Sequence, residues 1–281
     1  MGGTPETETG AAVTAEGLGV RASHGWAFRG ADVAADPGAL IAVEGPSGSG
    51  RTSLLLTLTG RMRPTEGYGH VGGFRVPQQM ARIRRISALA HVPGVTELDP
   101  VLTVAEHLRE RALLRRRFAD SPRGLLRPRR ERAAASRAAI DAALTAAGLD
   151  LDTLPKGPRT AVRDLERLEA LRLSIALALI ARPRLLAVDD ADLKLSDDDR
   201  ERAWALLREI AADGTTVLAV CSQAPRGAVV VRTARTSAAE NGESGARARR
   251  NQKADAPATD EHAHDENEEG SADALAETRR A

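Results

Sequence analysis

The chain has 281 residues, a formal net charge of +1 and a single cysteine, Cys221. A near-neutral balance identifies no charged partner, one cysteine excludes an internal disulfide framework, and no run approaches the roughly 18 apolar residues of a membrane-spanning helix. Residues 1–10 lack the basic start and apolar core of a signal peptide, so the sequence predicts a cytoplasmic protein in a reducing compartment.

The periodicity of the chain predicts one folded domain between two tails. Residues 1–12 are polar and predict a disordered tail, and residues 236–281 have no periodicity and predict a disordered charged tail. Residues 13–235 form the predicted domain, in which strand-like runs give way to helical patterns near residue 101. A helical subdomain is expected over about residues 101–174.

The first strong local pattern is a strand, a glycine-rich loop and a helix. Residues 40–43 predict a buried strand, and residues 52–58 predict a helix that ends near Gly60. The loop matches the phosphate-binding pattern G-x-x-x-x-G-K-[ST], with Arg51 in place of lysine. Its backbone N–H groups and the helix N-terminus are expected to bind phosphate; a plain glycine-rich turn is the alternative. The predicted nucleotide-binding residues are Gly45, Pro46, Ser47, Gly48, Ser49, Gly50, Arg51, Thr52 and Ser53.

Four helices and three strands are expected after residue 100. Thr103 is expected to cap the first helix, with Glu106 three residues later. Further helices are predicted over residues 133–148, 165–181 and 198–212, the last with Trp204 in the core. Buried strands are predicted over residues 185–188, 215–220 and 228–231. This order predicts an α/β sheet with a helical subdomain.

Two acidic residues follow the predicted strand over residues 185–188. Asp189 is expected at the carboxyl edge of the sheet beside the loop, where it would hold Mg²⁺ together with Thr52. Asp190 is expected to orient an attacking water. The alternative is a pair of solvated acids at a strand end.

Five motifs in this order resemble the ATP-binding cassette of ABC transporters, over residues 13 to about 232. The loop GPSGSGRTSLL is similar to the family's GPSGSGKTTLL, and RPRLLAVDD at residues 182–190 is similar to R-P-x-L-L-L-L-D-E. Residues 63–67 resemble R-P-T-x-G, residues 102–108 resemble L-T-V-x-E-x-L, and residues 215–220 resemble the strand before the family's switch histidine. The resemblance implies a P-loop NTPase with a RecA-like core sheet and a helical subdomain. It also implies ATP and Mg²⁺ as cofactors and a membrane-spanning, permease-type partner.

Several positions depart from the family pattern. Asp190 replaces the catalytic glutamate, Ser222 replaces the switch histidine, and His91 stands where the glutamine loop is expected. These three are the candidate catalytic residues. The aromatic residue that stacks on adenine is absent near residue 22, and His24 and Trp26 are the candidates to replace it. If Trp26 does not bind adenine, it is expected in the core.

The family signature L-S-G-G-Q aligns with LERLE at residues 165–169. In the family this segment contacts the γ-phosphate of ATP bound to the opposite subunit of a dimer. Glu166 and Glu169 would place carboxylates near that phosphate, which is repulsive. The resemblance therefore favours a heterodimer with a second ABC cassette over a homodimer.

Residues 107–137 contain eleven arginines, where the family's helical subdomain meets its membrane partner. A basic face there predicts contact with an anionic membrane surface; a solvated face is the alternative. Nucleic acid is disfavoured as a partner, because single-strand binders interleave aromatic residues and this segment contains only Phe118.

The sequence therefore predicts the ATP-binding subunit of an ABC-type transport system, peripheral at the inner face of the cell membrane, with weak hydrolysis. A regulatory pseudo-ATPase that binds nucleotide without turnover is the first alternative. A soluble ABC protein acting on nucleic acid is the second.

Overall fold

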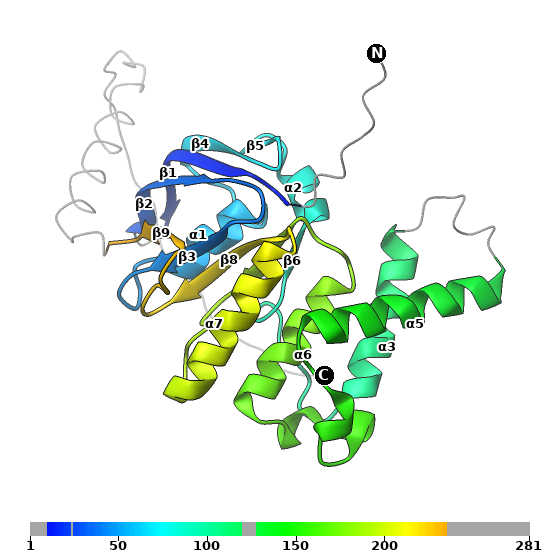
Figure 1. Cartoon of the computed structure of the whole chain (residues 1–281). Helices are drawn as coiled ribbons and strands as arrows, with labels where there is room; N and C mark the ends of the chain where they lie inside the picture. Colours follow the sequence, from blue (N-terminus) through cyan, green and yellow to red (C-terminus); the bar gives the residue numbers. More distant parts are fainter. Residues whose placement is uncertain (1–9, 24, 120–127, 235–281) are drawn as a thin grey trace, which may run out of the picture. The chain divides into compact units, whose positions relative to one another are not determined.

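A parallel sheet of five strands forms the centre of the domain (Figure 1). The computed structural model describes residues 10–23, 25–119 and 128–234, without the side chains of residues 116–119 and 129. The strands lie in the order β6-β7-β8-β3-β9. Their bounds are Leu40–Glu44 for β3, Ser87–Leu89 for β6, Leu185–Val188 for β7, Thr216–Cys221 for β8 and Val229–Arg232 for β9. The strands predicted over residues 40–43, 185–188, 215–220 and 228–231 are confirmed within one residue at each end.

The parallel strands are apolar along their length because both faces of the sheet are covered. Successive side chains point to opposite faces. Ile41 and Val43 belong to one buried cluster with helix α1, Arg51–Leu58. Leu40 and Ala42 belong to the other, with α6, Arg167–Leu179, and α7, Asp197–Ala212. This double covering explains why the strands are continuous apolar runs in the sequence.

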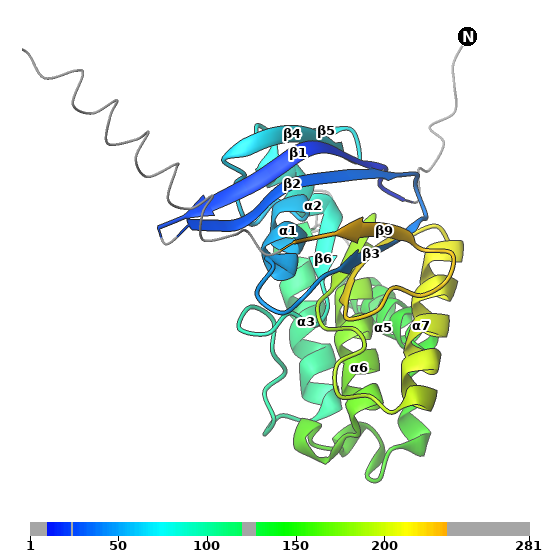
Figure 2. The ribbon, with the colours of Figure 1, turned by 90° about the vertical axis from the view of Figure 1, so that its left-hand side faces the viewer.

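A second, antiparallel sheet has the order β2-β1-β4-β5. Figure 2 shows this sheet on the far side of α1 from the helices α3, α6 and α7. Its bounds are Val13–Ala22 for β1, Gly25–Ala35 for β2, Glu66–Val71 for β4 and Phe74–Val76 for β5. Helix α2, Met80–Ile86, was not predicted, because it is too short to show periodicity and buries only Ile83. The fold is the predicted α/β architecture.

The helical region follows the strand β6. Its helices are α3, Val104–Ala119, and α5, Arg129–Ala146, followed by three short 3-10 helices, Leu151–Thr153, Gly157–Arg159 and Val162–Asp164, and then by α6. The predicted cap of α3 is confirmed: Thr103 N donates to Glu106 Oε2 at 2.7 Å, and Glu106 N donates back to Thr103 Oγ1 at 3.3 Å. Helix α5 begins four residues before its predicted start. Helix α6 continues past the expected subdomain boundary near residue 174.

The prediction of a loose tail over residues 1–12 is wrong for its last residues. Ala11 is fully buried, and its N–H and carbonyl oxygen both bond to the hydroxyl of Thr216 on β8, at 3.0 and 2.8 Å. The polar character of the segment hid this contact, because the buried side chain at residue 11 is a small alanine. Residues 1–9 and 235–281 lie outside the described residues.

Among the residues described by the structure, none of the helices combines the length and the apolarity that crossing a lipid bilayer requires. Trp204 on α7 is buried at 5% exposure and lies in the core, as predicted.

We expect Thr216→Val to lower the free energy of unfolding by about 1–3 kcal/mol, the typical cost of leaving buried polar groups without partners. The Thr216 hydroxyl also accepts from Gly38 N at 2.9 Å, and no other acceptor is assigned to that N–H among the described residues. Urea denaturation monitored by circular dichroism measures the change. The matched control is Thr215→Val, at a half-buried neighbour whose hydroxyl has no assigned bond in the described part of the chain. An equal loss in both variants would contradict this account.

Candidate functional site

The loop between β3 and α1 lies at the carboxyl edge of the parallel sheet. Gly50 precedes α1 with φ 82°, in the left-handed region that favours glycine, and a Cβ there would overlap the carbonyl oxygen of Ala27. A Cβ on Gly45 would lie 2.5 Å from the carbonyl oxygen of Thr233. Both positions require glycine, because neighbouring backbone atoms leave no room for a side chain. These close contacts fix the conformation of the loop.

The backbone of the loop presents N–H groups at the start of α1. The N–H groups of Gly50, Arg51 and Thr52 have no assigned acceptor in the residues that the structure describes, as expected at a helix N-terminus. Pro46, Ser47 and Gly48 are exposed and form the rim of the loop, and Ser53 is half-buried in the first turn of α1. The arrangement suits a phosphate group.

Ser49 has a structural contact. Its side chain is buried and its hydroxyl lies 2.7 Å from the hydroxyl of Thr233, just after β9. This buried contact attaches the loop to the end of β9.

The Arg51 guanidinium reaches across the edge of the sheet. Its Nη1 donates to the carbonyl oxygen of Cys221, at the end of β8, at 2.7 Å. A lysine amine is a compact point charge, whereas the planar guanidinium presents several N–H donors in a fixed fork. In this structure the Arg51 side chain is held by the protein backbone.

Thr52 and Asp189 are in direct contact although they are 137 residues apart in the chain. Thr52 Oγ1 donates to Asp189 Oδ2 at 2.6 Å, and Asp190 N donates to the other carboxylate oxygen at 2.9 Å. Asp189 is 2% exposed, and burial raises the pKa of its carboxyl, while the hydrogen bond from Thr52 opposes that rise. A hydroxyl and a carboxylate side by side are the oxygen ligands that Mg²⁺ takes in proteins.

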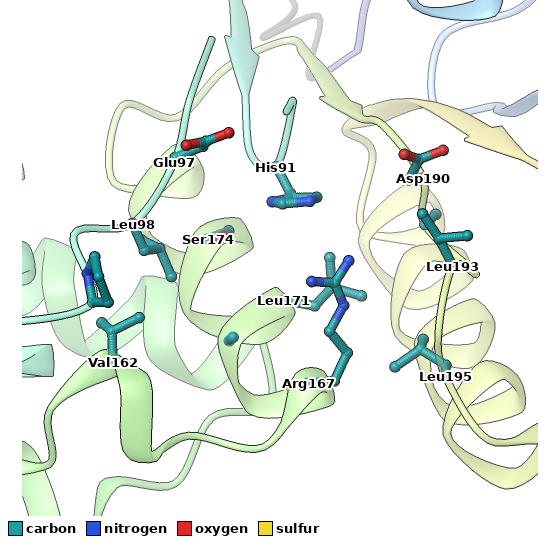
Figure 3. Close-up of a pocket in the computed structure, with 13 residues that line it drawn as sticks. His91, Glu97, Leu98, Val162, Arg167, Leu171, Ser174, Asp190, Leu193 and Leu195 are labelled. Carbon is teal, nitrogen blue, oxygen red and sulfur yellow. The ribbon is translucent and has the colours of Figure 1, made fainter. Parts of the chain in front are cut away.

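Asp190 and His91 both line a cavity that the loop does not line (Figure 3). Asp190 has φ 48°, unusual for a residue with a side chain. The carbonyl oxygen of His91 accepts from Asp189 N at 2.7 Å, which fixes the segment after β6 against β7. Burial lowers the pKa of the His91 imidazole, Arg167 adds to the shift, and Asp190 opposes it.

Ser222 is bound by a residue that sequence reasoning missed. The buried carboxylate of Asp192 accepts from Ser222 Oγ at 2.7 Å, from Ser222 N at 3.0 Å and from Gln223 N at 3.4 Å. The signal that could have found it is a third acid, two residues after Asp190. The structure therefore ties Ser222 to Asp192.

The residue after Trp26, Ala27, touches Gly50 of the loop with its carbonyl group. Trp26 itself lies on β2, with its ring against Gly19 of β1. It is half-buried and is not part of either core cluster, so the alternative expectation that it lies in the core is wrong. The guanidinium groups of Arg29 and Arg21 lie 4.6 and 5.9 Å from the centroid of its ring. The indole ring of Trp26 is therefore already in contact with guanidinium groups. His24 lies outside the described residues.

The N-terminus of α6 is closed by its own side chains. Glu169 Oε2 accepts from Glu166 N at 2.8 Å, and the Glu166 carboxylate accepts from the backbone N–H of Glu169, which forms a capping box. The two carboxylates expected to repel a phosphate occupy the position where this helix would otherwise present N–H groups. A phosphate at this terminus would have to displace an internal anion.

The basic segment is described only in part. Residues 120–127 lie outside the described residues. Arg111 is half-buried, its Nε donates to the carbonyl oxygen of Leu177 at 3.1 Å, and burial lowers its pKa. At least this arginine has a structural contact instead of contributing to a solvent-facing basic surface.

These positions define a P-loop nucleotide-binding protein: a glycine-shaped loop after a parallel strand, a hydroxyl at the helix start, and a carboxylate at the end of a neighbouring strand. A family model described as ABC transporter matches residues 28–192. The chain belongs to that family, and the fold is that of its nucleotide-binding domain. Cassettes of this family bind ATP.

Similar proteins include transporter subunits of two kinds. The cytochrome c biogenesis ATP-binding export protein CcmA of Cupriavidus necator is 31% identical over 214 residues, covering 76% of this chain and 84% of that protein. The ribose import ATP-binding protein RbsA 1 of Rhizobium johnstonii is 27% identical over 205 residues, 72% of this chain. The chain spans 37% of the length of that import protein.

Solved structures share the fold at lower identity. The dimeric structure of MJ0796, a bacterial ABC transporter cassette, has a TM-score of 0.59 and 20% sequence identity, covering 79% of this chain and 94% of that chain. Another structure of that cassette, a dimer bound to ADP and Pi, has a TM-score of 0.56 and 22% identity, covering 75% of this chain and 88% of that chain.

We expect Asp189→Asn to raise the free energy of unfolding near neutral pH when nucleotide and metal are absent. The ordinary pKa of the carboxyl is 3.8 and the native value is raised, so the native state binds the proton more tightly than the unfolded chain. Wild-type stability is therefore complete below the ordinary value and falls as pH rises through the raised value. Asparagine removes this loss and can still accept from Asp190 N and donate to Thr52.

Urea denaturation in a chelator, between about pH 4 and about pH 8, measures the difference between the variant and the wild type. The gap should open as pH rises. The control is Asp197→Asn, because the Asp197 side chain is 92% exposed. A gap that does not change with pH would refute the stated cause.

Proposed function

We propose that this chain is the ATP-binding subunit of an ABC-type transport system, acting with a separate membrane-spanning protein. The observation that carries the proposal is the contact between Thr52 Oγ1 and Asp189 Oδ2 at 2.6 Å, beside the loop. The names of relatives that import ribose or export during cytochrome c biogenesis support a transport role. We place the protein at the inner face of the cell membrane through its partner.

Mg²⁺ fits the residues present. Thr52 and Asp189 would hold it, and the bound ion would neutralise charge on the phosphates. The N–H groups of Gly50, Arg51 and Thr52 would bind the phosphate oxygens, with Gly45, Ser47 and Gly48 shaping the approach. Arg51 would exchange the Cys221 carbonyl oxygen for a phosphate oxygen. Trp26 would contact adenine if its arginine partners move aside.

Hydrolysis would be weak because the groups that favour it are altered. The Asp190 carboxylate is one methylene shorter than the family's glutamate. Ser222 donates to Asp192, and His91 has a lowered pKa in place of a glutamine side chain. Displacing a catalytic group by about 1 Å can cost roughly a hundredfold in rate.

The regulatory pseudo-ATPase is the second candidate, favoured by the closed N-terminus of α6. The two candidates differ in phosphate release at saturating ATP in the presence of the membrane partner. Release that the partner stimulates supports the transport subunit, and complete absence of release supports the pseudo-ATPase. We also propose that the arginines of residues 107–137, apart from Arg111, contact the partner or an anionic membrane surface.

We expect saturable ATP binding, on the order of micromolar to millimolar, that strengthens with Mg²⁺. Replacing both oxygen ligands, Thr52→Ala with Asp189→Asn, should remove the effect of Mg²⁺. Titration with a fluorescent ATP analogue, with and without the metal, measures this. The matched control is Thr145→Ala with Asp197→Asn, which changes the same residue types at exposed helix positions. Unchanged Mg²⁺ dependence in the site variant would overturn the assignment.

We expect no ATP-induced homodimer, because each γ-phosphate would meet the carboxylates of Glu166 and Glu169 in a poorly solvated gap. Size-exclusion chromatography with light scattering, in ATP and Mg²⁺, measures the oligomeric state. The variant Glu166→Ser with Glu169→Gln keeps a serine–glutamine capping box and removes both charges, so it should dimerise more readily. A stable wild-type homodimer in ATP would contradict the expectation of a heterodimer with a second cassette.

A further inference from the structure

A cavity of about 370 Å³ lies next to the candidate nucleotide site and is separate from it. It is formed by the segment after β6, by the first turns of α6 and by the segment after β7 (Figure 3). None of the loop residues from Gly45 to Ser53 lines it. Its volume is within the range of small-molecule sites, which are roughly 300–1,000 Å³.

Charged groups of both signs face this cavity. The guanidinium of Arg167 points toward His91 in Figure 3, with the carboxylate of Asp190 on one side and that of Glu97 on the other. Within the described residues, no hydrogen bond or ion pair is assigned to the side chain of Arg167 or of Asp190. Glu97 has one assigned bond, from Gly94 N at 2.8 Å. Both signs of charge are therefore available to a ligand.

The rest of the cavity wall is apolar. Figure 3 shows Leu98 and Val162 on one side and Leu193 and Leu195 on the other, with Leu171 between them. Leu193 is 43% exposed, unusual for a leucine that lies beside a buried strand end. A small apolar group in the cavity would cover these side chains, and apolar burial stabilises a complex.

We propose that this cavity binds a small zwitterion that carries a carboxylate, an ammonium group and a branched apolar chain, which is the chemistry of an apolar α-amino acid. A simple anion would meet two carboxylates, and a simple cation would meet Arg167. A zwitterion pairs its carboxylate with Arg167 and its ammonium group with Asp190, the carboxylate whose replacement is tested below. The apolar chain then lies among the leucines.

Such a ligand would act on the protein through Asp190 and His91. Both line the cavity, and both follow the strands β7 and β6 at the edge where the nucleotide is proposed to bind. An ammonium group paired with Asp190 would hold that carboxylate away from the phosphates. The ligand would therefore be a regulator. Its binding does not depend on the proposed function, because it requires no nucleotide.

Isothermal titration calorimetry of the full chain with L-leucine, in the absence of nucleotide, tests the proposal. Isocaproate lacks the amine and isopentylamine lacks the carboxylate, so each should bind at least about tenfold more weakly than leucine. L-Alanine, which lacks the branched chain, should also bind more weakly. Absence of saturable leucine binding would overturn the proposal, and equal affinity for isocaproate would show an anion site instead.

Two variants separate the two charges. Arg167→Met should weaken leucine binding about tenfold or more and leave isopentylamine binding unchanged. Asp190→Asn should weaken leucine binding and leave isocaproate binding unchanged or stronger. Arg163→Met is the matched control, because Arg163 is 66% exposed, pairs with Asp164 and does not line the cavity. Thermal melts of each variant establish folding. Leucine binding that is unchanged in Arg167→Met would place the ligand elsewhere and refute the proposal.

Discussion

The strand order β6-β7-β8-β3-β9 is the constraint on which the site depends. In a parallel sheet all carboxyl ends lie at one edge, so the loop after β3, Asp189 after β7, Ser222 after β8 and His91 close after β6 reach the same edge. These strands are separated by helices and loops of very different lengths. The hydrogen bond between Thr52 and Asp189 joins the start of α1 to the end of β7, although β8 lies between β7 and β3 in the sheet.

Three of the altered positions share one physical feature: their side chains are bonded to other groups of the protein. Arg51 bonds to the Cys221 carbonyl oxygen, Ser222 bonds to Asp192, and Glu166 bonds to the start of α6. Each of these groups would have to exchange an internal partner for a ligand. The N–H groups of Gly50, Arg51 and Thr52 need no such exchange, because no acceptor is assigned to them in the described part of the chain. Binding through an altered side chain has the added cost of breaking an internal hydrogen bond. Nucleotide binding, which uses the loop backbone, is therefore less affected than hydrolysis, which needs the altered side chains.

Much of the fold was predictable because its signals are local. The buried strands are apolar runs, the loop after β3 is glycine-rich, and Thr103 with Glu106 forms a capping box that the sequence shows directly. The contact between Thr52 and Asp189 followed from the order of strands. The short helix α2 and the packed Ala11 gave too little pattern to be recognised. Asp192 was missed because its partner Ser222 lies after β8, 30 residues later in the chain. The site assignments themselves stay predictions.

The central claim is that the loop after β3 binds the phosphates of ATP and that Arg51 changes its partner when it does. A crystal structure of the chain with Mg²⁺ and a non-hydrolysable ATP analogue tests this most directly. We expect the phosphates over the N–H groups of Gly50, Arg51 and Thr52, the metal between Thr52 and Asp189, and the Arg51 guanidinium on a phosphate oxygen. Phosphates bound elsewhere, or Arg51 still bonded to the Cys221 carbonyl oxygen beside a bound nucleotide, would contradict the account.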